Sequence, residues 1–492
     1  MSSHGERAPE ASLGLLDATM IGMGAMIGAG IFVLTGLAAE IAGPAAILVF
    51  ALNGVVTTFT GLSYAELASA IPKSGGGYAF VREIFADLPS FLMGWMLWFA
   101  YMIAGGLYAL GFAPNFLELL HVYGVTAAPD QVGAIVLPLL DAAVPATVLL
   151  AFIAVLGLIL LNAVSTAASG TVETVFTATK VVILLVFVGF GVTAPQFSSA
   201  EFQPLFPGAK TGLSILPAMG LTFIAFEGYD LITTVTEEVK NPRKNIPRAI
   251  FLSLAATVVV YLLVVTVAIG TLGWQDLAAA GEAGIAQAAT AFMPRGIPII
   301  QTGGAIIVFG AVFSTLTALN AVVIASSRVA FSMGRARQLL PKFGQLHHRF
   351  GTPFAAILVS AVVMLGSVAL PTKSAGNMSS LFFLLSFVVV NGAVIKLRRE
   401  RPDMNRPYEM PFYPAPPVLG IVLNLVLTGV LVEYLWRTDR LALLLSAGWI
   451  VAGVLAYVAL DRYVTQESGI EAGATGGAQI AETDAAVHHQ QE

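Results

Sequence analysis

Cysteine is absent from the 492 residues, so the chain can form neither a disulfide framework nor a thiolate metal site. Charged residues are scarce, because they make up 11% of the chain against about 25% in an average soluble domain. The formal net charge of −5 is small and argues against nucleic acid as a partner. With 57% apolar residues, a chain of this length is typical of a protein that lies in a lipid bilayer.

The apolar residues gather in stretches long enough for helices that cross a bilayer, which takes about 20 residues each. Pro and Gly residues punctuate the joints between these stretches. We therefore predict an all-α integral membrane protein with twelve transmembrane helices and no sizeable soluble domain. The twelve predicted stretches are residues 15–40, 44–71, 87–113, 145–165, 170–193, 212–238, 247–270, 297–327, 353–371, 377–397, 417–436 and 441–461.

The two ends of the chain are polar. Residues 1–10 are mixed in charge and precede a long apolar segment, so we expect an uncleaved membrane protein without a signal peptide. The residues after Asp461 are rich in Gly, Ala, Glu and Gln and are expected to be disordered. Most Lys and Arg residues fall in segments on the side of the N-terminus. The positive-inside rule then predicts a multi-pass protein of the plasma membrane with both termini in the cytoplasm.

Two of the apolar stretches are interrupted by small or polar residues. The first interruption runs from Gly24 to Phe32, and the second runs from Phe223 to Asp230. Backbone that unwinds within a bilayer exposes N–H and C=O groups, at a cost of several kcal/mol each unless a polar group pairs with them. Interruptions at corresponding positions of two halves indicate a substrate site built from half-helix ends, as in secondary transporters.

The first interruption has Gly28 and Gly30 on either side of Ala29. An unwound turn here would direct free N–H groups toward an anion such as the carboxylate of an amino acid. Carbonyl groups at the end of the preceding half-helix would accept hydrogen bonds from its ammonium group. Close helix packing is the alternative interpretation, because Gly24 and Gly28 form a G-x-x-x-G pattern.

The second interruption holds two carboxylates, Glu227 and Asp230, on either side of Gly228. A charge at membrane depth costs about 2.5–3.5 kcal/mol even on the mildest scale, which indicates a function. The neighbouring Phe226 is predicted to close over a small ligand as a gate. In the alternative interpretation Glu227 forms a structural ion pair with Lys180, and Asp230 lies near cytoplasmic water.

Lys180 lies near the centre of the fifth stretch. Burial disfavours the charged form of a lysine, which makes Lys180 a candidate proton carrier. When charged, it could bridge carbonyl groups of the first stretch to hydroxyl groups of the eighth. A structural pair with Glu173 is the alternative. The eighth stretch offers hydroxyl groups at Ser314, Thr315 and Thr317.

No metal site is predicted. His347 and His348 are adjacent, so they do not share a helix face as paired metal ligands do. A membrane enzyme would need a nucleophile–base pair or a metal cluster, and the sequence contains no such constellation. We therefore expect no enzymatic activity and no cofactor, with a proton as the coupling ion.

Several motifs occur in the order typical of a known family. They are Ser63 to Leu67 followed by Ile71 to Gly76, the run from Glu237 to Ala249, and Ser327-Arg328 followed by Leu340-Pro341. With the two interruptions, they resemble the amino acid–polyamine–organocation (APC) superfamily over residues 13 to 462. The chain looks most like the proton-coupled broad-specificity amino acid transporters of this superfamily and their cationic-amino-acid relatives.

The resemblance implies a LeuT-like fold that works by alternating access. Two inverted repeats of five helices would be followed by two further helices, with helices 1 and 6 discontinuous. The implied divisions are an N-terminal tail (1–12), a first repeat (13–193), a second repeat (212–397), helices 11 and 12 (398–462) and a C-terminal tail (463–492).

The resemblance also implies roles for individual residues. Ile27, Gly28, Ala29 and Gly30 would bind the α-carboxylate and amine of the substrate through their backbone, and Ala225, Phe226 and Gly228 would form the facing wall. Lys180 would take the place of a sodium ion in the proton-coupled relatives, with Ser314 and Thr317 facing it. Relatives usually have an apolar residue where Glu227 stands. Glu227 therefore favours either a cationic substrate or a second proton-linked carboxylate.

These observations predict a secondary active amino acid transporter, driven by protons, in the lipid bilayer. Exchange of one amine for another and sodium-coupled symport are alternatives within the same class. A transport-inactive sensor or scaffold is an alternative from another class. We expect a monomer or a weak homo-oligomer.

Overall fold

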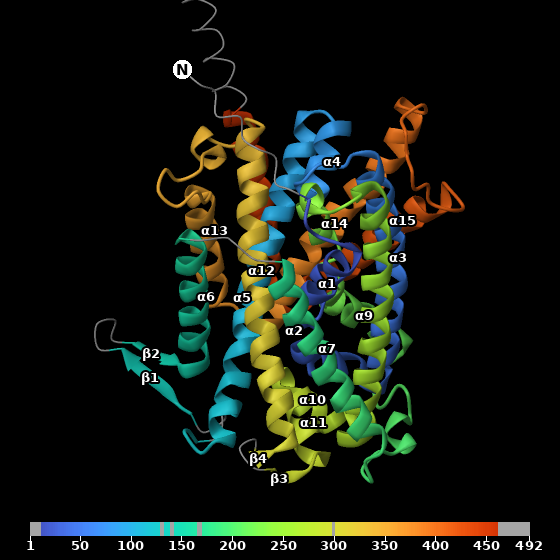
Figure 1. The fold of residues 1–492 in the computed structure, drawn as a ribbon. Helices are drawn as coiled ribbons and strands as arrows, with labels where there is room; N and C mark the ends of the chain where they lie inside the picture. Colours follow the sequence, from blue (N-terminus) through green and yellow to red (C-terminus); the bar gives the residue numbers. More distant parts are fainter. Residues whose placement is uncertain (1–10, 128–131, 138–141, 165–169, 298–300, 461–492) are drawn as a thin grey trace, which may run out of the picture.

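The computed structural model describes residues 11–127, 132–137, 142–164, 170–297 and 301–460 (Figure 1). The predicted C-terminal tail (463–492) and all but the last two residues of the predicted N-terminal tail (1–12) lie outside the described residues. Within the described part, ten helical stretches are long and apolar enough to cross a membrane. The chain is therefore a multi-pass membrane protein.

The ten stretches comprise the following helices, with 3₁₀ helices labelled η. Two of the stretches contain several helices each. Leu15–Ala70 comprises α1 (Leu15–Met26), α2 (Ala29–Ala42), η1 (Gly43–Ala45) and α3 (Ala46–Ala70), and Gly212–Glu238 comprises η4 (Gly212–Ser214), α8 (Ile215–Thr222), η5 (Phe223–Phe226) and η6 (Asp230–Glu238). The other eight stretches are Asp87–Val122 (α5), Ala146–Val164 (α6), Val172–Val192 (within α7, Gly170–Val192), Pro242–Leu272 (α9), Gly303–Arg335 (α12), Thr372–Glu400 (α14), Ala415–Thr438 (α15) and Arg440–Leu460. A shorter apolar helix, α13 (Phe354–Ser367), lies between α12 and α14.

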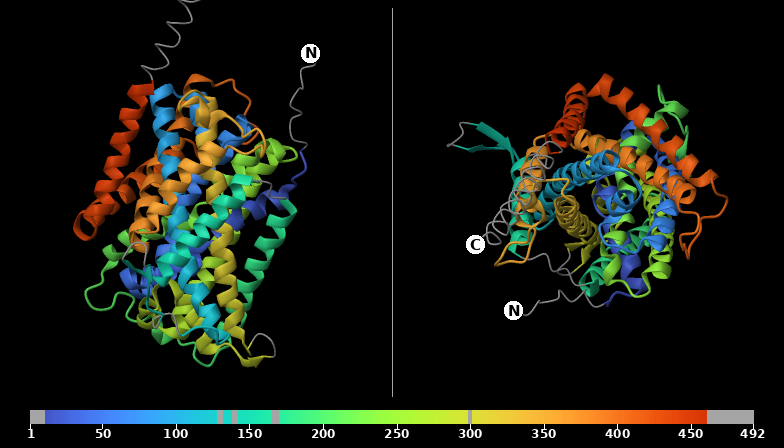
Figure 2. Two further views of the ribbon diagram at one scale, coloured as in Figure 1. Left: turned by 90° about the vertical axis from the view of Figure 1, so that its left-hand side faces the viewer. Right: turned by 90° about the horizontal axis from the view of Figure 1, so that it is seen from above.

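The stretches differ in how deeply they are buried. In the most apolar window of Leu15–Ala70, Asp87–Val122 and Gly212–Glu238, 89% of the residues are buried within the molecule. The corresponding share is 28% in α15 and 17% in Arg440–Leu460, which lie along one edge of the bundle in orange and red (Figure 2). The two interrupted stretches and α5 therefore form the interior, whereas the last two stretches are placed to face lipid.

Shorter elements cap the two ends of the bundle and were not predicted. Helix α4 (Gly76–Ile84) lies at one end, and α10 (Trp274–Ala279) and α11 (Gly284–Phe292) lie at the other (Figure 1). Each is too short to span a bilayer, so a search for apolar stretches of spanning length passes over them. The remaining 3₁₀ helices are η3 (Ser199–Phe202), η7 (Gly281–Ala283) and η8 (Pro341–Gly344).

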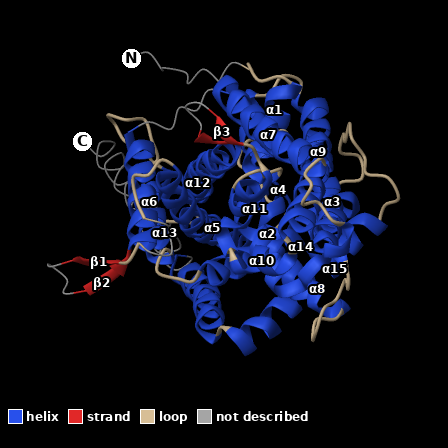
Figure 3. Cartoon of the chain, turned by 90° about the horizontal axis from the view of Figure 1, so that it is seen from below, coloured by secondary structure: helices blue, strands red, loops and turns tan. Residues whose placement is uncertain are grey.

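Two small β-hairpins modify the all-α prediction. Strand β1 (Ala134–Leu137) pairs antiparallel with β2 (Ala142–Pro145), and β3 (Arg295–Ile297) pairs antiparallel with β4 (Gln301–Thr302). Figure 3 shows that helices form almost all of the described molecule and that β1 and β2 project from its side. Helix α5 continues beyond its predicted end at residue 113 to Val122, because Phe116 and Leu119 still pack against the core.

One ion-pair cluster braces the end of the bundle that carries both ends of the described chain. The guanidinium of Arg398, at the end of α14, donates to both carboxylate oxygens of Glu66 on α3, at 2.7 and 2.8 Å. The backbone N–H of Met410 donates to the same carboxylate at 2.9 Å. Glu66 thus holds the loop between α14 and α15 against α3.

A second, more exposed cluster closes the opposite end. Lys373, at the start of α14, pairs with Glu40 near the end of α2 at 2.5 Å, and their side chains are 36% and 48% exposed. The ammonium of Lys210 donates to the backbone carbonyls of Glu40 and Ile41 and lies 5.4 Å from the ring of Trp274. These contacts tie α2 to α14 and to the loops at that end.

Candidate functional site

The first predicted interruption is present, and its centre lies between one and two residues earlier than that of the glycine cluster. Helix α1 ends at Met26, Ile27 has φ −75° and ψ 62°, and Gly28 has φ −110° and ψ −133°. Ala29 and Gly30 begin α2 instead of lying in the unwound turn. The break between α1 and α2 is therefore two residues long.

The second predicted interruption is also present. Helix α8 narrows into η5, which ends at Phe226, and η6 begins at Asp230. Glu227 is extended, with φ −79° and ψ 140°, and Gly228 has φ +137°. Because residues with a side chain rarely adopt a positive φ, a glycine at position 228 makes this turn possible.

The two interrupted stretches lie directly against each other. A Cβ atom added to Gly228 would lie 2.7 Å from the backbone nitrogen of Met26, and one added to Gly30 would lie 2.6 Å from the Cα of Ala225. Close packing by glycine, the alternative interpretation of the first interruption, is thus present together with the break. A Cβ on Gly28 would likewise lie 2.4 Å from the Cβ of Ala318 on α12.

Tyr261 of α9 joins the two breaks, and sequence reasoning missed it. Its buried hydroxyl lies 2.5 Å from the carbonyl oxygen of Met26 and 2.9 Å from that of Ala225, and it shares its single donor proton between them. One phenol therefore satisfies a freed carbonyl in each interrupted stretch. The available signal was a tyrosine in the middle of an apolar span, where its hydroxyl needs a buried partner.

Lys180 of α7 contacts the first interrupted stretch, as predicted. The side chain is fully buried, and its ammonium donates to the carbonyl of Gly24 at 2.9 Å. Within the described residues, neither Glu173 nor Glu227 forms an ion pair with Lys180 at the 4.0 Å limit. Neither alternative pairing of Lys180 is therefore present.

The predicted hydroxyl groups of α12 take separate roles. Ser314 donates to the carbonyl of Ile27 at 2.6 Å, which satisfies another carbonyl freed by the break. Thr317 donates to carbonyl groups of its own helix at 3.0 and 2.9 Å, so its hydroxyl is engaged within α12 and is not directed to Lys180. Thr315 also bonds within its helix. Ser314 and Lys180 thus both act on α1, at carbonyls three residues apart.

The beginning of α2 has no side-chain cap, because its N-cap residue is Gly28. The N–H group of Gly28 donates to the carbonyl of Met26 at 2.7 Å. The N–H groups of the first turn of α2, which starts at Ala29, have no carbonyl one turn earlier in the same helix. Their positive dipole end is suited to a carboxylate.

Glu227 is buried without a hydrogen-bond partner. It is 4% exposed, and neither carboxylate oxygen has a partner in the described part of the chain. Asp230, by contrast, is 1% exposed and accepts hydrogen bonds from the hydroxyl of Tyr101 and from the N–H of Gly228 at 3.0 Å. Asp230 is therefore a buried, paired group. The alternative interpretation, in which Asp230 lies near cytoplasmic water, is wrong.

A small cavity lies beside Glu227. Its volume is about 10 Å³, close to the least space that one water molecule needs. Small side chains on two helices form part of its wall, and two phenols form another part. The small residues of the wall are Ala25, Gly228, Ala318 and Ala321, and the phenols are those of Tyr101 and Tyr108.

Phe226 lies on the other side of its backbone, within an aromatic cluster. Its ring is fully buried, 5.4 Å from the ring of Tyr261 and 6.1 Å from that of Phe50. It does not line the cavity beside Glu227. The gate role predicted for Phe226 stays a prediction.

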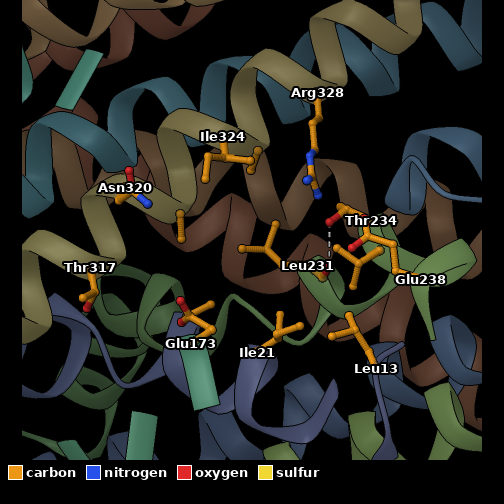
Figure 4. A pocket seen from close by; sticks show the side chains of 14 residues that line it. Leu13, Ile21, Glu173, Leu231, Thr234, Glu238, Thr317, Asn320, Ile324 and Arg328 are labelled. Carbon is orange, nitrogen blue, oxygen red and sulfur yellow. Dashed lines mark hydrogen bonds between the residues drawn. The ribbon is translucent and has the colours of Figure 1, made fainter. Parts of the chain in front are cut away.

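A larger cavity of about 110 Å³ opens between α1, η6 and α12 at the end of the bundle that carries both ends of the described chain. Figure 4 shows Arg328 extending from α12 toward Thr234 and Glu238, while Glu173 and Thr317 line the opposite side. We call this cavity the vestibule. Its wall shares Ala25, Leu231 and Ala321 with the cavity beside Glu227, so the two spaces adjoin at these side chains.

No group of three or more His, Cys, Asp or Glu residues that could hold a metal ion occurs among the described residues. The polar atoms of the site are instead backbone carbonyls, uncapped N–H groups, one lysine, the carboxyl groups of Glu227 and Asp230, and several hydroxyls. Such a set can bind a small zwitterion, and it lacks a nucleophile with an adjacent base.

Two interrupted helices that meet inside a multi-pass bundle, with a vestibule leading toward them, define a membrane transporter. The model of the amino acid permease family matches residues 13–458. The chain belongs to the amino acid permease family, and it is a transporter rather than an enzyme.

Its similar relatives carry different substrates in their names. A branched-chain amino acid permease, BcaP, of Bacillus subtilis (strain 168) is 29% identical over 475 residues, which cover 94% of this chain and 95% of the relative. A methylthioribose transporter of the same organism is 29% identical, with 92% and 93% covered. Cationic amino acid transporter 4 of Homo sapiens is 29% identical, with 79% and 60% covered.

Proposed function

We propose that the protein is a secondary active amino acid transporter of the plasma membrane that couples uptake to protons and works by alternating access. The observation that carries the proposal is the meeting of two interrupted stretches whose freed carbonyls are held by Lys180, Ser314 and Tyr261. Broken helices of this kind build the substrate sites of secondary transporters.

The proposed architecture has twelve spans in two inverted repeats of five, followed by two more. Counting α1–α2 and α3 as separate spans, and adding the shorter α13, gives this number. The breaks then fall in the first and sixth spans, which are the corresponding positions of two five-span repeats. This correspondence supports the inverted-repeat arrangement.

The proposed orientation has both termini in the cytoplasm. Residue 11 and residue 460 lie toward the same end of the bundle (Figure 2). Arg82, Arg328, Arg337 and Arg398 belong to segments at that end, as the positive-inside rule requires of a cytoplasmic face. The vestibule would then open to the cytoplasm.

The substrate would bind through its main-chain groups at the first break. Its carboxylate would meet the uncapped start of α2, and its ammonium would meet the carbonyls of Ile27 and Ala225. Each of these two carbonyls accepts one hydrogen bond, from Ser314 or Tyr261, and a carbonyl oxygen has two lone pairs. One acceptor position on each therefore remains for the ligand, whereas the carbonyl of Met26 already accepts from both Tyr261 and the N–H of Gly28.

Lys180 would couple the transport cycle to protons. As an ammonium it donates to the carbonyl of Gly24, and the neutral amine would release that carbonyl or hold it weakly. Protonation would then favour the conformation in which α1 lies against α7. A positive charge placed directly on this carbonyl also supports proton coupling over sodium coupling, because a bound sodium ion would need the same kind of ligand.

The test is uptake of a panel of labelled amino acids into liposomes that contain the purified full-length chain. Imposed proton and sodium gradients are compared, in vesicles that are empty or preloaded with amino acid. We expect uptake into empty vesicles to follow the proton gradient. In Lys180→Met this dependence should be lost, whereas Lys342→Met, which alters an exposed lysine of η8, should retain it.

Three outcomes would contradict parts of this proposal. Uptake that follows sodium and ignores pH would contradict proton coupling, as would a Lys180→Met variant with full pH dependence. Uptake that requires preloaded vesicles would identify an exchanger. A chain that binds and moves none of the amino acids would remove the transport proposal itself and favour a sensor or scaffold.

A further inference from the structure

Glu227 is a buried carboxylate beside the interrupted helices that has neither a role in the mechanism above nor a hydrogen-bond partner among the described residues. Its two oxygens have no hydrogen-bond partner in the described part of the chain, and the residue is only 4% exposed. The neighbouring acid, Asp230, is already held by Tyr101 and by the backbone of Gly228. The unpartnered carboxylate and the cavity it lines are therefore separate from the backbone groups that would bind the main chain of a substrate.

No cation among the described residues neutralises Glu227. Lys180 donates to the carbonyl of Gly24 instead, and no Lys, Arg or His in the described part of the chain lies within 4.0 Å of the Glu227 carboxylate. A buried, unpaired charge costs far more than a hydrogen-bonded one. In the closed and empty conformation the Glu227 carboxyl group must therefore carry a proton.

We propose that Glu227 recognises the positively charged side chain of a cationic amino acid and gives up its proton when that side chain binds. The inference rests on the proposed function and adds its substrate class. As the ligand enters, the O–H bond of the carboxylic acid breaks, the proton leaves through the vestibule, and the carboxylate pairs with the ammonium of the ligand. No net charge is then added to the buried chamber.

The surroundings of Glu227 fit an aliphatic side chain with a charged end. The small residues Ala25, Gly228, Ala318 and Ala321 leave room for methylene groups once the cavity opens. The vestibule shares part of this wall, so an entering side chain and a leaving proton have the same short route to water. A neutral ligand would leave Glu227 protonated, and the chamber would again stay uncharged.

The other titratable groups around Glu227 are not expected to change their protonation when a cationic ligand binds. Asp230 belongs to the same stretch, Tyr101 and Tyr108 come from α5, Tyr64 comes from α3, and Tyr229 is two residues away. The phenols do not ionise in the working range of pH, and Asp230 keeps its partners. On α1 and α12 the cavity is lined by alanine and valine, and on α14 by Phe383. One proton at Glu227 therefore accounts for the expected difference in pH dependence between a cationic and a neutral ligand.

The test compares L-lysine with L-norleucine, which has the same chain without the terminal ammonium. Binding to the purified full-length protein is measured by titration calorimetry in buffers of different ionisation enthalpy and at several pH values. We expect lysine to bind with release of about one proton, so that its affinity rises with pH up to about tenfold per unit. Norleucine should bind without this proton release, and any pH dependence that Lys180 imposes is common to both ligands.

The variant Glu227→Gln keeps the size and the neutral form of the side chain. It should bind lysine about thirtyfold or more weakly, because a buried charge pair is lost. Norleucine should bind it as it binds the wild type. The matched control is Glu83→Gln, a partly exposed glutamate on α4 that pairs with Lys73, and it should leave both ligands unaffected.

The outcomes separate the inference from the function on which it rests. Binding of norleucine but not lysine, lysine binding without proton release, or an equal loss of both ligands in Glu227→Gln would each overturn the inference. Amino acid transport could still stand in those cases. If neither ligand nor any other amino acid binds the wild type, the proposed function fails instead. The wild-type proton count needs no variant, so a Glu227→Gln chain that fails to fold does not remove the test.

Discussion

Replacing Tyr261 with Phe removes one oxygen atom from the junction of the two breaks. That hydroxyl serves the carbonyls of Met26 and Ala225 at 2.5 and 2.9 Å in a fully buried position. The phenol has one proton, which the two carbonyls share, and taking the donor away from a buried acceptor costs about 1–3 kcal/mol. We expect the variant to lose roughly 2 kcal/mol of the free energy that holds the breaks together.

The sensitive assay is hydrogen exchange of backbone amides, measured by mass spectrometry on the full-length protein without substrate. A loss of roughly 2 kcal/mol raises a local opening equilibrium about thirtyfold. Peptides that contain residues 25–28 and 225–228 should therefore exchange about thirtyfold faster in the variant. Peptides from the peripheral α15 should not change.

Tyr123→Phe is the matched control, because Tyr123 is 44% exposed just beyond the end of α5. It removes the same atom from a tyrosine that joins no broken helices, and exchange at the breaks should stay at the wild-type level. If Tyr261→Phe also exchanges like the wild type at both breaks, the hydroxyl does not hold them together. The reasoning about freed carbonyls would then be refuted.

Three further substitutions test other parts of the structure. Phe226→Ala should weaken uptake while leaving expression intact, and unchanged transport by this variant would count against a gate. Gly228→Ala should abolish uptake, because its φ of +137° is strained for alanine and the new Cβ would lie 2.7 Å from the nitrogen of Met26; normal uptake would show that the breaks can separate freely. Glu66→Gln should destabilise the protein by roughly 3 kcal/mol, because it removes a buried charge that faces Arg398, and a melting temperature equal to that of the wild type would contradict this expectation.

Local sequence was enough to predict the two interruptions, because a break in a membrane helix needs residues that are visible in isolation. Glycine lowers the cost of unwinding, and a carboxylate such as Glu227 is expensive at that depth. The position of the first break differed, since Ala29 and Gly30 lie in α2. Several glycines in the same stretch also serve helix packing, and only tertiary contacts separate the two uses.

Contacts between distant elements were harder to predict. The bond from Lys180 to the first stretch was expected, because a buried ammonium must find acceptors and the freed carbonyls are the nearest kind. Tyr261 gave no comparable signal, since a tyrosine in an apolar helix is compatible with many partners. The isolation of Glu227 could not be predicted either, because Asp230 takes the donors next to it. Whether Glu227 or Asp230 is hydrogen-bonded depends on the position of Tyr101, which lies on another helix, α5.

The pair between Glu40 and Lys373 also bears on how readily the far end of the bundle opens. Ion pairs at exposed positions contribute at most about 1 kcal/mol, and dissolved salt weakens them further. The exposed pair therefore holds this end closed only weakly, in contrast to the buried ion pair of Glu66 and Arg398 at the other end. The ionic strength of the solution bathing that surface therefore sets part of the balance between shut and open forms, and a saltier medium eases the release of α2 from α14.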